Sequence, residues 1–156
     1  MKQRVYIDTS VIGGCFDQEF EEWSNRLFDD FKSGTKIAVI SDITIDELSD
    51  APQKVQENFK AIPDDSLEIL VSDSETRALA DKYINEKAVS SRFYEDALHI
   101  AIATTHQVNV LASWNFKHIV NLDRIRLYNS VNIKNGYPFL EIRSPREILK
   151  FEDDED

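Results

Sequence analysis

The stretch that decides the fold is Lys36-Ile37-Ala38-Val39-Ile40-Ser41. Its centre is apolar at every position instead of every second one, which is typical of a strand buried on both faces of a parallel sheet. Shorter runs rich in β-branched residues lie before and after it, separated by segments with apolar residues at helical spacing. This alternation predicts an α/β fold, a three-layer α/β/α arrangement with a mainly parallel central sheet.

The same patterns give approximate boundaries. We expect parallel strands at residues 4–8, 36–41, 67–71 and 108–112, and helices at about 19–32, 44–50, 53–61, 72–86 and 93–107. The C-terminal part differs, because strand-like segments at 125–128 and 139–142 flank Asn135-Gly136, a dipeptide typical of hairpin turns. We therefore predict a C-terminal β-hairpin extension, followed by a last short helix that begins at Ser144-Pro145.

Length and composition indicate one globular domain. The chain has 156 residues, of which 42% are hydrophobic and 30% charged, and we assign residues 1–150 to a single domain. Residues 151–156 are mostly acidic, and we expect this tail to be disordered. No apolar run is long enough to cross a membrane, no signal-peptide pattern opens the chain, and Cys15 is the single cysteine. These features indicate a cytoplasmic protein without disulfides.

Charge limits the partners that the chain can bind. Its net charge of −11 works against nucleic acid, because Lys and Arg contacts usually supply most of that affinity. The charge is uneven, however, since the stretch from Lys117 to Lys150 carries seven Lys and Arg residues against three acids. A basic surface is therefore expected from this C-terminal part.

Three acids occupy positions where a parallel sheet brings side chains together. Asp8 ends the first strand, Glu47 lies one turn into the helix after the second strand, and Asp96 lies in the first turn of the helix before the fourth. Clustered carboxylates repel one another unless a cation joins them. Ligands that are all oxygen favour Mg²⁺ or Mn²⁺, which can activate water and neutralise phosphate charge.

Each acid also has a purely structural interpretation, which the residues alone leave open. Asp8 is a good helix N-cap, and Asp96 suits the positive end of a helix dipole. Glu47 completes the spacing of a capping box with Thr44. The joint placement of the three acids, more than any one of them, favours a functional site.

Three stretches in the same order resemble the successive motifs of PIN-domain nucleases, and especially of VapC-type toxins. They are Tyr6-Ile7-Asp8-Thr9-Ser10-Val11-Ile12, Ser41-Asp42-Ile43-Thr44-Ile45-Asp46-Glu47-Leu48 and Asp96-Ala97-Leu98-His99-Ile100-Ala101-Ile102-Ala103. The resemblance, which extends over residues 4–122, implies a parallel sheet between helices and Mg²⁺- or Mn²⁺-dependent cleavage of RNA. It also implies that Asp8, Glu47 and Asp96 are the metal-binding and catalytic residues. A protein antitoxin and a homodimer are the partners expected by analogy.

The fourth motif departs from the family pattern. In Ser113-Trp114-Asn115-Phe116, Asn115 stands where the family usually has an Asp. An amide can offer its carbonyl oxygen to a metal or orient a water, but it brings no charge. We therefore count Asn115 among the catalytic candidates and expect one tight metal site with a weakened or absent second one.

Further candidates for substrate binding surround these motifs. They are Ser10, Ser113, Trp114, Lys117 and His118. Both serines also suit local roles, as a helix cap and as a turn residue, and His118 also suits a plain surface position. His99 lies one helical turn after Asp96, and we interpret it as a packed core histidine.

Two other functions compete with a ribonuclease. One is a catalytically weakened, PIN-like module that binds RNA or a partner protein, which Asn115 and the acidic charge favour. The other is a phosphatase that uses Asp8 as its nucleophile. Such phosphatases normally carry a second Asp two residues later, where this chain has Ser10. We rank the ribonuclease first.

Overall fold

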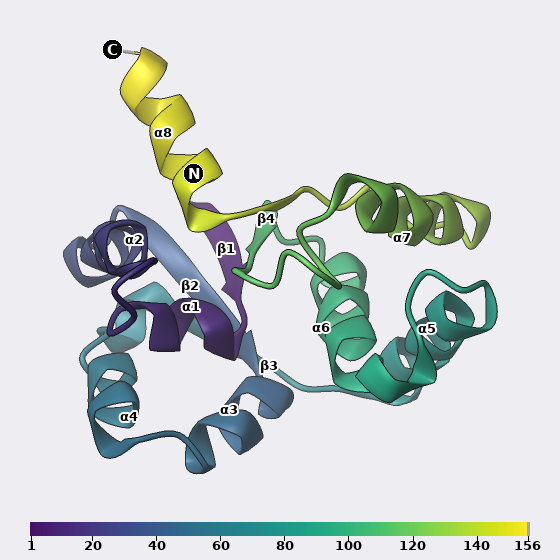
Figure 1. Cartoon of the computed structure of the whole chain (residues 1–156), viewed down its shortest axis with the longest axis horizontal. Helices are drawn as coiled ribbons and strands as arrows, with labels where there is room; N and C mark the ends of the chain where they lie inside the picture. The colour runs from purple at the N-terminus through teal and green to yellow at the C-terminus, as the bar shows by residue number, and fades with distance from the viewer. Residues whose placement is uncertain (156) are drawn as a thin grey trace.

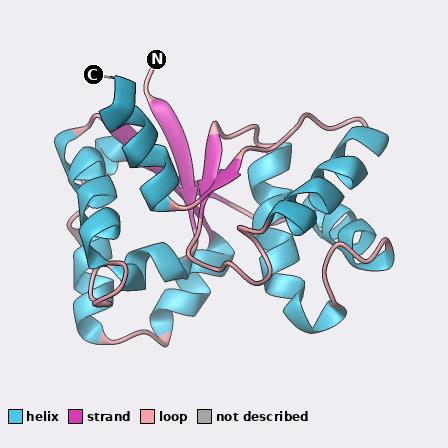
Figure 2. Cartoon of the chain, turned by 45° about the horizontal axis from the view of Figure 1, so that its top comes forward, coloured by secondary structure: helices cyan, strands magenta, loops and turns pink. Residues whose placement is uncertain are grey.

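A five-stranded, fully parallel sheet forms the centre of the chain in the computed structural model, which describes residues 1–155 (Figures 1 and 2). The strands are β1 (Gln3–Ile7), β2 (Lys36–Ser41), β3 (Leu67–Leu70), β4 (Val110–Ala112) and β5 (Ile142–Arg143). Their order in the sheet is β3-β2-β1-β4-β5. In register, Val5 of β1 lies beside Ala38 of β2 and Val110 of β4.

Helices cover both faces of this sheet, as Figure 2 shows. One side carries α1 (Thr9–Gly14), α2 (Glu21–Ser33), α4 (Gln53–Lys60) and α8 (Pro145–Glu155). The other side carries α5 (Ser74–Asn85), α6 (Tyr94–Thr105) and α7 (Leu122–Lys134). Helix α3 (Asp42–Ser49) follows β2 directly, and short 3₁₀ turns at Asp64–Ser66 and Ser91–Phe93 precede β3 and α6.

The central strands are buried on both faces, which explains their apolar sequences. Val5 and Ile7 belong to the core under α2 and α8, whereas Tyr6 between them belongs to the core under α5 to α7. In β2, Val39 likewise faces the second core, and its neighbour Ala38 the first. Because side chains alternate across a strand, both layers of helices pack on the same short strands. The predicted three-layer α/β/α fold is confirmed.

The strand order gives the sheet a topological switch point, the place where the strand order reverses, between β1 and β4. From β1 the chain moves outward through β2 to β3, and then returns to the other side of β1 to form β4 and β5. In open α/β sheets, ligands bind beyond the strand ends where this reversal occurs. Asp8 directly follows β1, and Ser113 directly follows β4. The first of the predicted acids therefore lies at this switch point.

The predicted C-terminal hairpin is wrong, because most of that segment is helix. Asn121 caps α7 by accepting hydrogen bonds from the backbone nitrogens of Asp123 and Arg124, at 3.1 and 3.3 Å. Tyr128 and Val131 are buried at a spacing of three, as a helix requires. Asn135-Gly136 ends this helix, with Gly136 at a φ of 82°, instead of forming a hairpin turn. The later strand-like segment supplies only β5, which pairs with β4 in parallel.

The acidic end of the chain, which we expect to be a disordered tail, is helical as far as Glu155. It continues helix α8, which packs beside α2 (Figure 1). The buried ammonium of Lys36 lies 2.7 Å from Asp30 and 3.0 Å from Glu152, and Arg26 lies 2.8 Å from Asp153. Partners distant in sequence therefore balance part of this acidic charge. Asp156 lies outside the described residues.

No helix in the part of the chain that the structure describes is both long and apolar enough to cross a membrane.

Candidate active site at the carboxyl edge of the sheet

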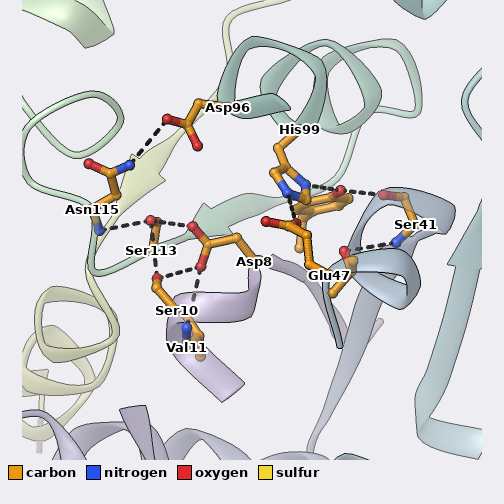
Figure 3. A network of polar contacts seen from close by, with 11 residues as sticks. Asp8, Ser10, Val11, Ser41, Glu47, Asp96, His99, Ser113 and Asn115 are labelled. Carbon is orange, nitrogen blue, oxygen red and sulfur yellow. Dashed lines mark hydrogen bonds and ion pairs between the residues drawn. The ribbon is translucent and has the colours of Figure 1, made fainter. Parts of the chain in front are cut away.

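Asp8 is fixed at the end of β1 by three hydrogen bonds (Figure 3). Its Oδ1 accepts from the Ser10 hydroxyl at 2.5 Å and from the backbone nitrogen of Val11 at 3.3 Å. Its Oδ2 accepts from the Ser113 hydroxyl at 2.6 Å. Asp8 is therefore the N-cap of α1 and also a carboxylate held between the first and fourth strands. The structural and functional interpretations of Asp8 do not exclude each other.

Burial sets the electrostatics of Asp8, whose side chain is almost fully enclosed. Burial raises the pKa of Asp8, although the charge of His99 and the hydroxyl donors of Ser10 and Ser113 oppose the rise. The two serines thus have one shared role, which is to hold and partly stabilise this carboxylate. The backbone nitrogen of Trp114 donates to Ser10 at 2.9 Å and that of Asn115 donates to Ser113 at 2.9 Å.

Glu47 is held by a contact that the sequence analysis did not predict. The capping contact at the start of α3 joins Ser41 and Thr44, whose hydroxyl accepts from the Ser41 nitrogen at 3.3 Å. Glu47 is therefore free of the predicted capping box, and its Oε1 accepts from Nε2 of His99 at 2.7 Å. Burial would raise the pKa of Glu47, but the hydrogen bond and the charge of His99, together with the Thr9 hydroxyl, outweigh burial and lower the pKa.

His99 is buried, as predicted, but it is also a polar link in a continuous chain (Figure 3). Its Nδ1 lies 2.6 Å from the Tyr6 hydroxyl, which in turn lies 2.8 Å from the Ser41 hydroxyl. Burial would lower the pKa of His99, but Tyr6, Glu47 and Asp8 outweigh burial and raise it to about 10. His99 is therefore a buried cation between the acids. The only sequence signal for it was its position one helical turn after Asp96.

Asp96 lies at the start of α6, where the charges of the other two acids affect its pKa. Burial raises its pKa to about 6, the negative charges of Asp8 and Glu47 add to the rise, and His99 opposes it. The three predicted acids are thus close enough to influence one another. Their mutual repulsion is what a bound cation would relieve, so the donor set suits a divalent metal ion.

The spacing of these acids limits how an ion would be held. Across residues 1–155, no three carboxylate, imidazole or thiolate groups lie close enough together to form a complete protein site for a metal. An ion here would take one or two carboxylates and complete its coordination with water and substrate oxygens, which is how Mg²⁺ is commonly bound. The Thr9 hydroxyl is also buried beside Asp8, without a partner in good hydrogen-bond geometry, yet near enough to Glu47 to help lower its pKa. It therefore belongs to the polar surroundings of the acids.

Asn115 contacts the cluster through its nitrogen, not its oxygen. Its Oδ1 accepts from the backbone nitrogens of Lys117 and His118, at 3.2 and 2.9 Å. Its Nδ2 donates to Oδ2 of Asp96 at 3.3 Å. The amide therefore shapes the turn after β4 and positions Asp96. In this arrangement its oxygen is not presented to a metal, in contrast to the role considered from the sequence.

The remaining predicted substrate-binding residues follow the same loop. The Trp114 indole is buried, donates to the Ser24 hydroxyl at 2.8 Å, and stacks on Phe20 with ring centroids 4.3 Å apart. The His118 ring stacks on Phe93 at 3.7 Å, while Lys117 is exposed. Burial, together with the charges of Lys117 and Arg124, lowers the pKa of His118. Within residues 1–155, neither Lys117 nor His118 bonds an acid of the cluster.

Fold and cluster together define an α/β protein with an acidic centre at the switch point of a parallel sheet. The family model of the PIN domain matches residues 5–118, a range that contains Asp8, Glu47, Asp96 and Asn115. The chain therefore belongs to the PIN domain family. No curated protein sequence matches the chain.

Two solved structures share this fold. Mycobacterium tuberculosis VapC20, a Sarcin-Ricin loop cleaving toxin, is similar with a TM-score of 0.57 at 11% identity, over 73% of this chain and 92% of that one. A chain of VapBC2 from Rickettsia felis, whose structure was solved with a DNA fragment from the VapBC2 promoter, gives a TM-score of 0.56 at 15% identity. That match covers 91% of this chain and 98% of the other. The fold is thus the one found in VapC toxins.

Proposed function

We propose that the chain is a metal-dependent endoribonuclease that hydrolyses phosphodiester bonds of RNA. The observation that carries the proposal is the placement of Asp8, Glu47 and Asp96 together at the switch point of the sheet, where the charges of Asp8 and Glu47 add to the rise that burial causes in the pKa of Asp96. Membership of the PIN domain family supports it. The proposed catalytic residues are these three acids with Asn115. The proposed metal ligands are the same three acids, of which one or two would contact an ion directly while water and substrate oxygens complete its coordination.

The side chains of the cluster have distinct roles in this proposal. A bound Mg²⁺ or Mn²⁺ would supply positive charge for the phosphate and lower the pKa of a water. Ser10 and Ser113 keep Asp8 in one orientation, and His99 does the same for Glu47. Asp96 has a pKa of about 6 in the metal-free protein, and a bound ion would favour its ionised form, in which it can serve as a ligand.

We further propose that the chain is the toxin of a type II toxin–antitoxin pair, with a protein antitoxin as its partner and a homodimer as its resting form. The similarity in fold to VapC20 and to the VapBC2 complex supports this. The test is co-purification with the product of a small neighbouring reading frame, which should inhibit RNA cleavage. A neighbouring product that neither binds nor inhibits would contradict the toxin assignment and leave a stand-alone nuclease.

RNA cleavage tests the nuclease itself. Wild-type protein should cleave single-stranded RNA with Mg²⁺ or Mn²⁺ but not with EDTA, and Asp8→Asn or Asp96→Asn should abolish cleavage. Asp46→Asn is the matched control, because Asp46 is exposed and lies next to Glu47 in the sequence. Cleavage that persists in both site variants would contradict the metal cluster as the reaction centre.

A weakened, non-cleaving module remains the second candidate, and one observation favours it. In the loop after β4, Asn115 stands where the family usually has an Asp, and its side-chain oxygen already accepts two backbone hydrogen bonds. The cluster therefore has three carboxylates. If RNA binds equally well with and without divalent ions, and no RNA is cleaved, the module is the better description.

A further inference from the structure

In the loop that follows β4, alternate residues contact two different parts of the molecule. Ser113 and Asn115 donate to Asp8 and Asp96, as Figure 3 shows. Trp114, which lies between these two residues, and Phe116, which follows them, instead line an aromatic groove on the side of α2 and α8. Consecutive Cα atoms are only about 3.8 Å apart. One short loop therefore carries both the contacts to the acids and part of the wall of the groove.

The groove has the size and lining of a site for a flat ring. Its volume is about 530 Å³, and aromatic rings of Phe20, Trp23, Trp114 and Phe116 form much of its wall. Phe116 is 48% exposed, so its ring is available to a ligand. The centroid of the Phe116 ring lies 6.3 Å from that of Phe20, in a tilted orientation, and 6.0 Å from that of Trp114, in an edge-on orientation.

The wall behind Phe116 is held in place before any ligand arrives. The Trp114 indole donates to the buried Ser24 hydroxyl and stacks almost parallel on Phe20, at an interplanar angle of 15°. Gly14 permits this packing, because a Cβ there would lie 2.8 Å from the indole nitrogen. A wall that is already ordered loses little conformational entropy when a ring stacks against it.

Positive charge lies on the α8 side of the same groove. Arg146 and Lys150 are exposed, and neither forms an ion pair with any residue in the described part of the chain. Of the two acids that line the groove, Glu147 accepts a hydrogen bond from the Ser144 nitrogen at 3.0 Å. The other, Glu19, is exposed at the opposite wall. Free cations beside aromatic rings are the combination that binds single-stranded nucleic acid.

We propose that this groove binds an unpaired nucleobase next to the scissile phosphate, stacked on Phe116, with Arg146 and Lys150 at the neighbouring phosphates. The proposal rests on the proposed ribonuclease function and names its substrate class, single-stranded RNA. Duplex RNA would not supply the base, because its bases are paired and stacked within the helix.

Tryptophan fluorescence gives a direct test, because the two Trp residues of the chain, Trp23 and Trp114, both line the groove. The probe is a short single-stranded oligoribonucleotide, titrated in EDTA so that it is not cleaved. It should quench the fluorescence, whereas an abasic backbone of the same length or the duplex should bind more weakly and quench little. Phe116→Ala should weaken binding by between about 5-fold and 150-fold, the usual effect of losing one base–aromatic stack.

Two sets of variants complete the test. Phe139→Ala, a matched change at another exposed phenylalanine, should leave binding unchanged. Replacing Arg146 and Lys150 by Gln should weaken binding and reduce its dependence on salt. Equal quenching by the abasic backbone, an unaffected Phe116→Ala, or quenching by an apolar acidic peptide in place of RNA would overturn the groove proposal. Base-dependent quenching without any metal-dependent cleavage would instead overturn only the nuclease.

Discussion

Asp96→Asn should abolish cleavage and yet stabilise the metal-free fold at pH 8. The reason is that the Asp96 carboxyl is buried beside Asp8 and Glu47, which raises its pKa to about 6. Asn keeps the shape of the side chain and an oxygen that can accept from Asn115, but it removes the charge. The alternative, in which Asp96 only complements the dipole of α6, predicts the opposite sign, a loss of about 0.3 to 1 kcal/mol.

The magnitude follows from the pKa difference between the folded and unfolded chain. A rise from 3.8 to about 6 corresponds to at most about 3 kcal/mol. Because Asp96 is only partly buried and solvent screens its charge, we expect about 1 to 2 kcal/mol. The folded protein binds the proton more tightly, so this penalty is absent below pH 3.8, grows as the pH rises, and is complete above about 6.

Unfolding by urea in EDTA, at pH 8 and at pH 4.5, measures this directly. At pH 8 the variant should be more stable than wild type by about 1 to 2 kcal/mol, or about 2 to 8 °C in Tm. At pH 4.5 most of the advantage should vanish, because Asp96 is protonated in the folded wild type. Asp46→Asn should change neither value. A destabilised variant at pH 8, or a gain of equal size at both pH values, would refute the argument from carboxylate repulsion.

Mn²⁺ extends the same experiment. A ligand that binds only the folded state raises its stability in proportion to the logarithm of its concentration. Added Mn²⁺ should therefore stabilise wild type and have little effect on Asp96→Asn, so that the order of stabilities reverses at high concentrations of the ion. Equal stabilisation of both proteins would place the ion elsewhere.

Three further predictions concern the supporting structure. Gly14→Ala should destabilise the fold by about 1 to 3 kcal/mol in urea, because a Cβ there would lie 2.6 Å from a serine hydroxyl, whereas Gly13→Ala, with open space around it, should be neutral or slightly stabilising. His99→Phe should lower kcat for RNA by releasing Glu47, and His99→Gln should restore part of the rate if positioning is the role. Glu152→Gln leaves a buried ammonium with one carboxylate partner and should cost about 1 kcal/mol of unfolding free energy; an unchanged stability would mean that α8 is held by its apolar contacts alone.

The parts of the fold that sequence could predict are those fixed by local pattern. The apolar run at β2 is buried on both faces because the strand is central, and the acids Asp8 and Glu47 follow strands whose carboxyl ends share one edge. Parallel topology alone brings such positions together. The location of the site therefore followed from the strand pattern and the order of the acids.

The parts that sequence missed depend on contacts between distant residues. Asn135-Gly136 suits both a hairpin turn and a helix end, and only the burial of Tyr128 on α5 and α6 decides for the helix. The helical end of the chain pairs its acids with Lys36 and Arg26, which lie far away in the sequence. Side-chain orientation is equally non-local, which is why the contact of His99 with Glu47 was not predicted.

The charges of the cluster, taken together, explain why a neutral amide suits position 115. Three carboxylates already face one buried cation, His99, and the charges of Asp8 and Glu47 still add to the rise that burial causes in the pKa of Asp96. A fourth carboxylate would replace the N–H group that now donates to Asp96 at 3.3 Å, and two like charges about 4 Å apart near a protein surface repel by about 4 kcal/mol. Asp96 would then stay protonated well above neutral pH in the absence of an ion. With Asn115 at this position, Asp96 is mostly ionised above about pH 6. The phosphate of the substrate would bring to a bound ion the negative charge that a fourth carboxylate would otherwise supply.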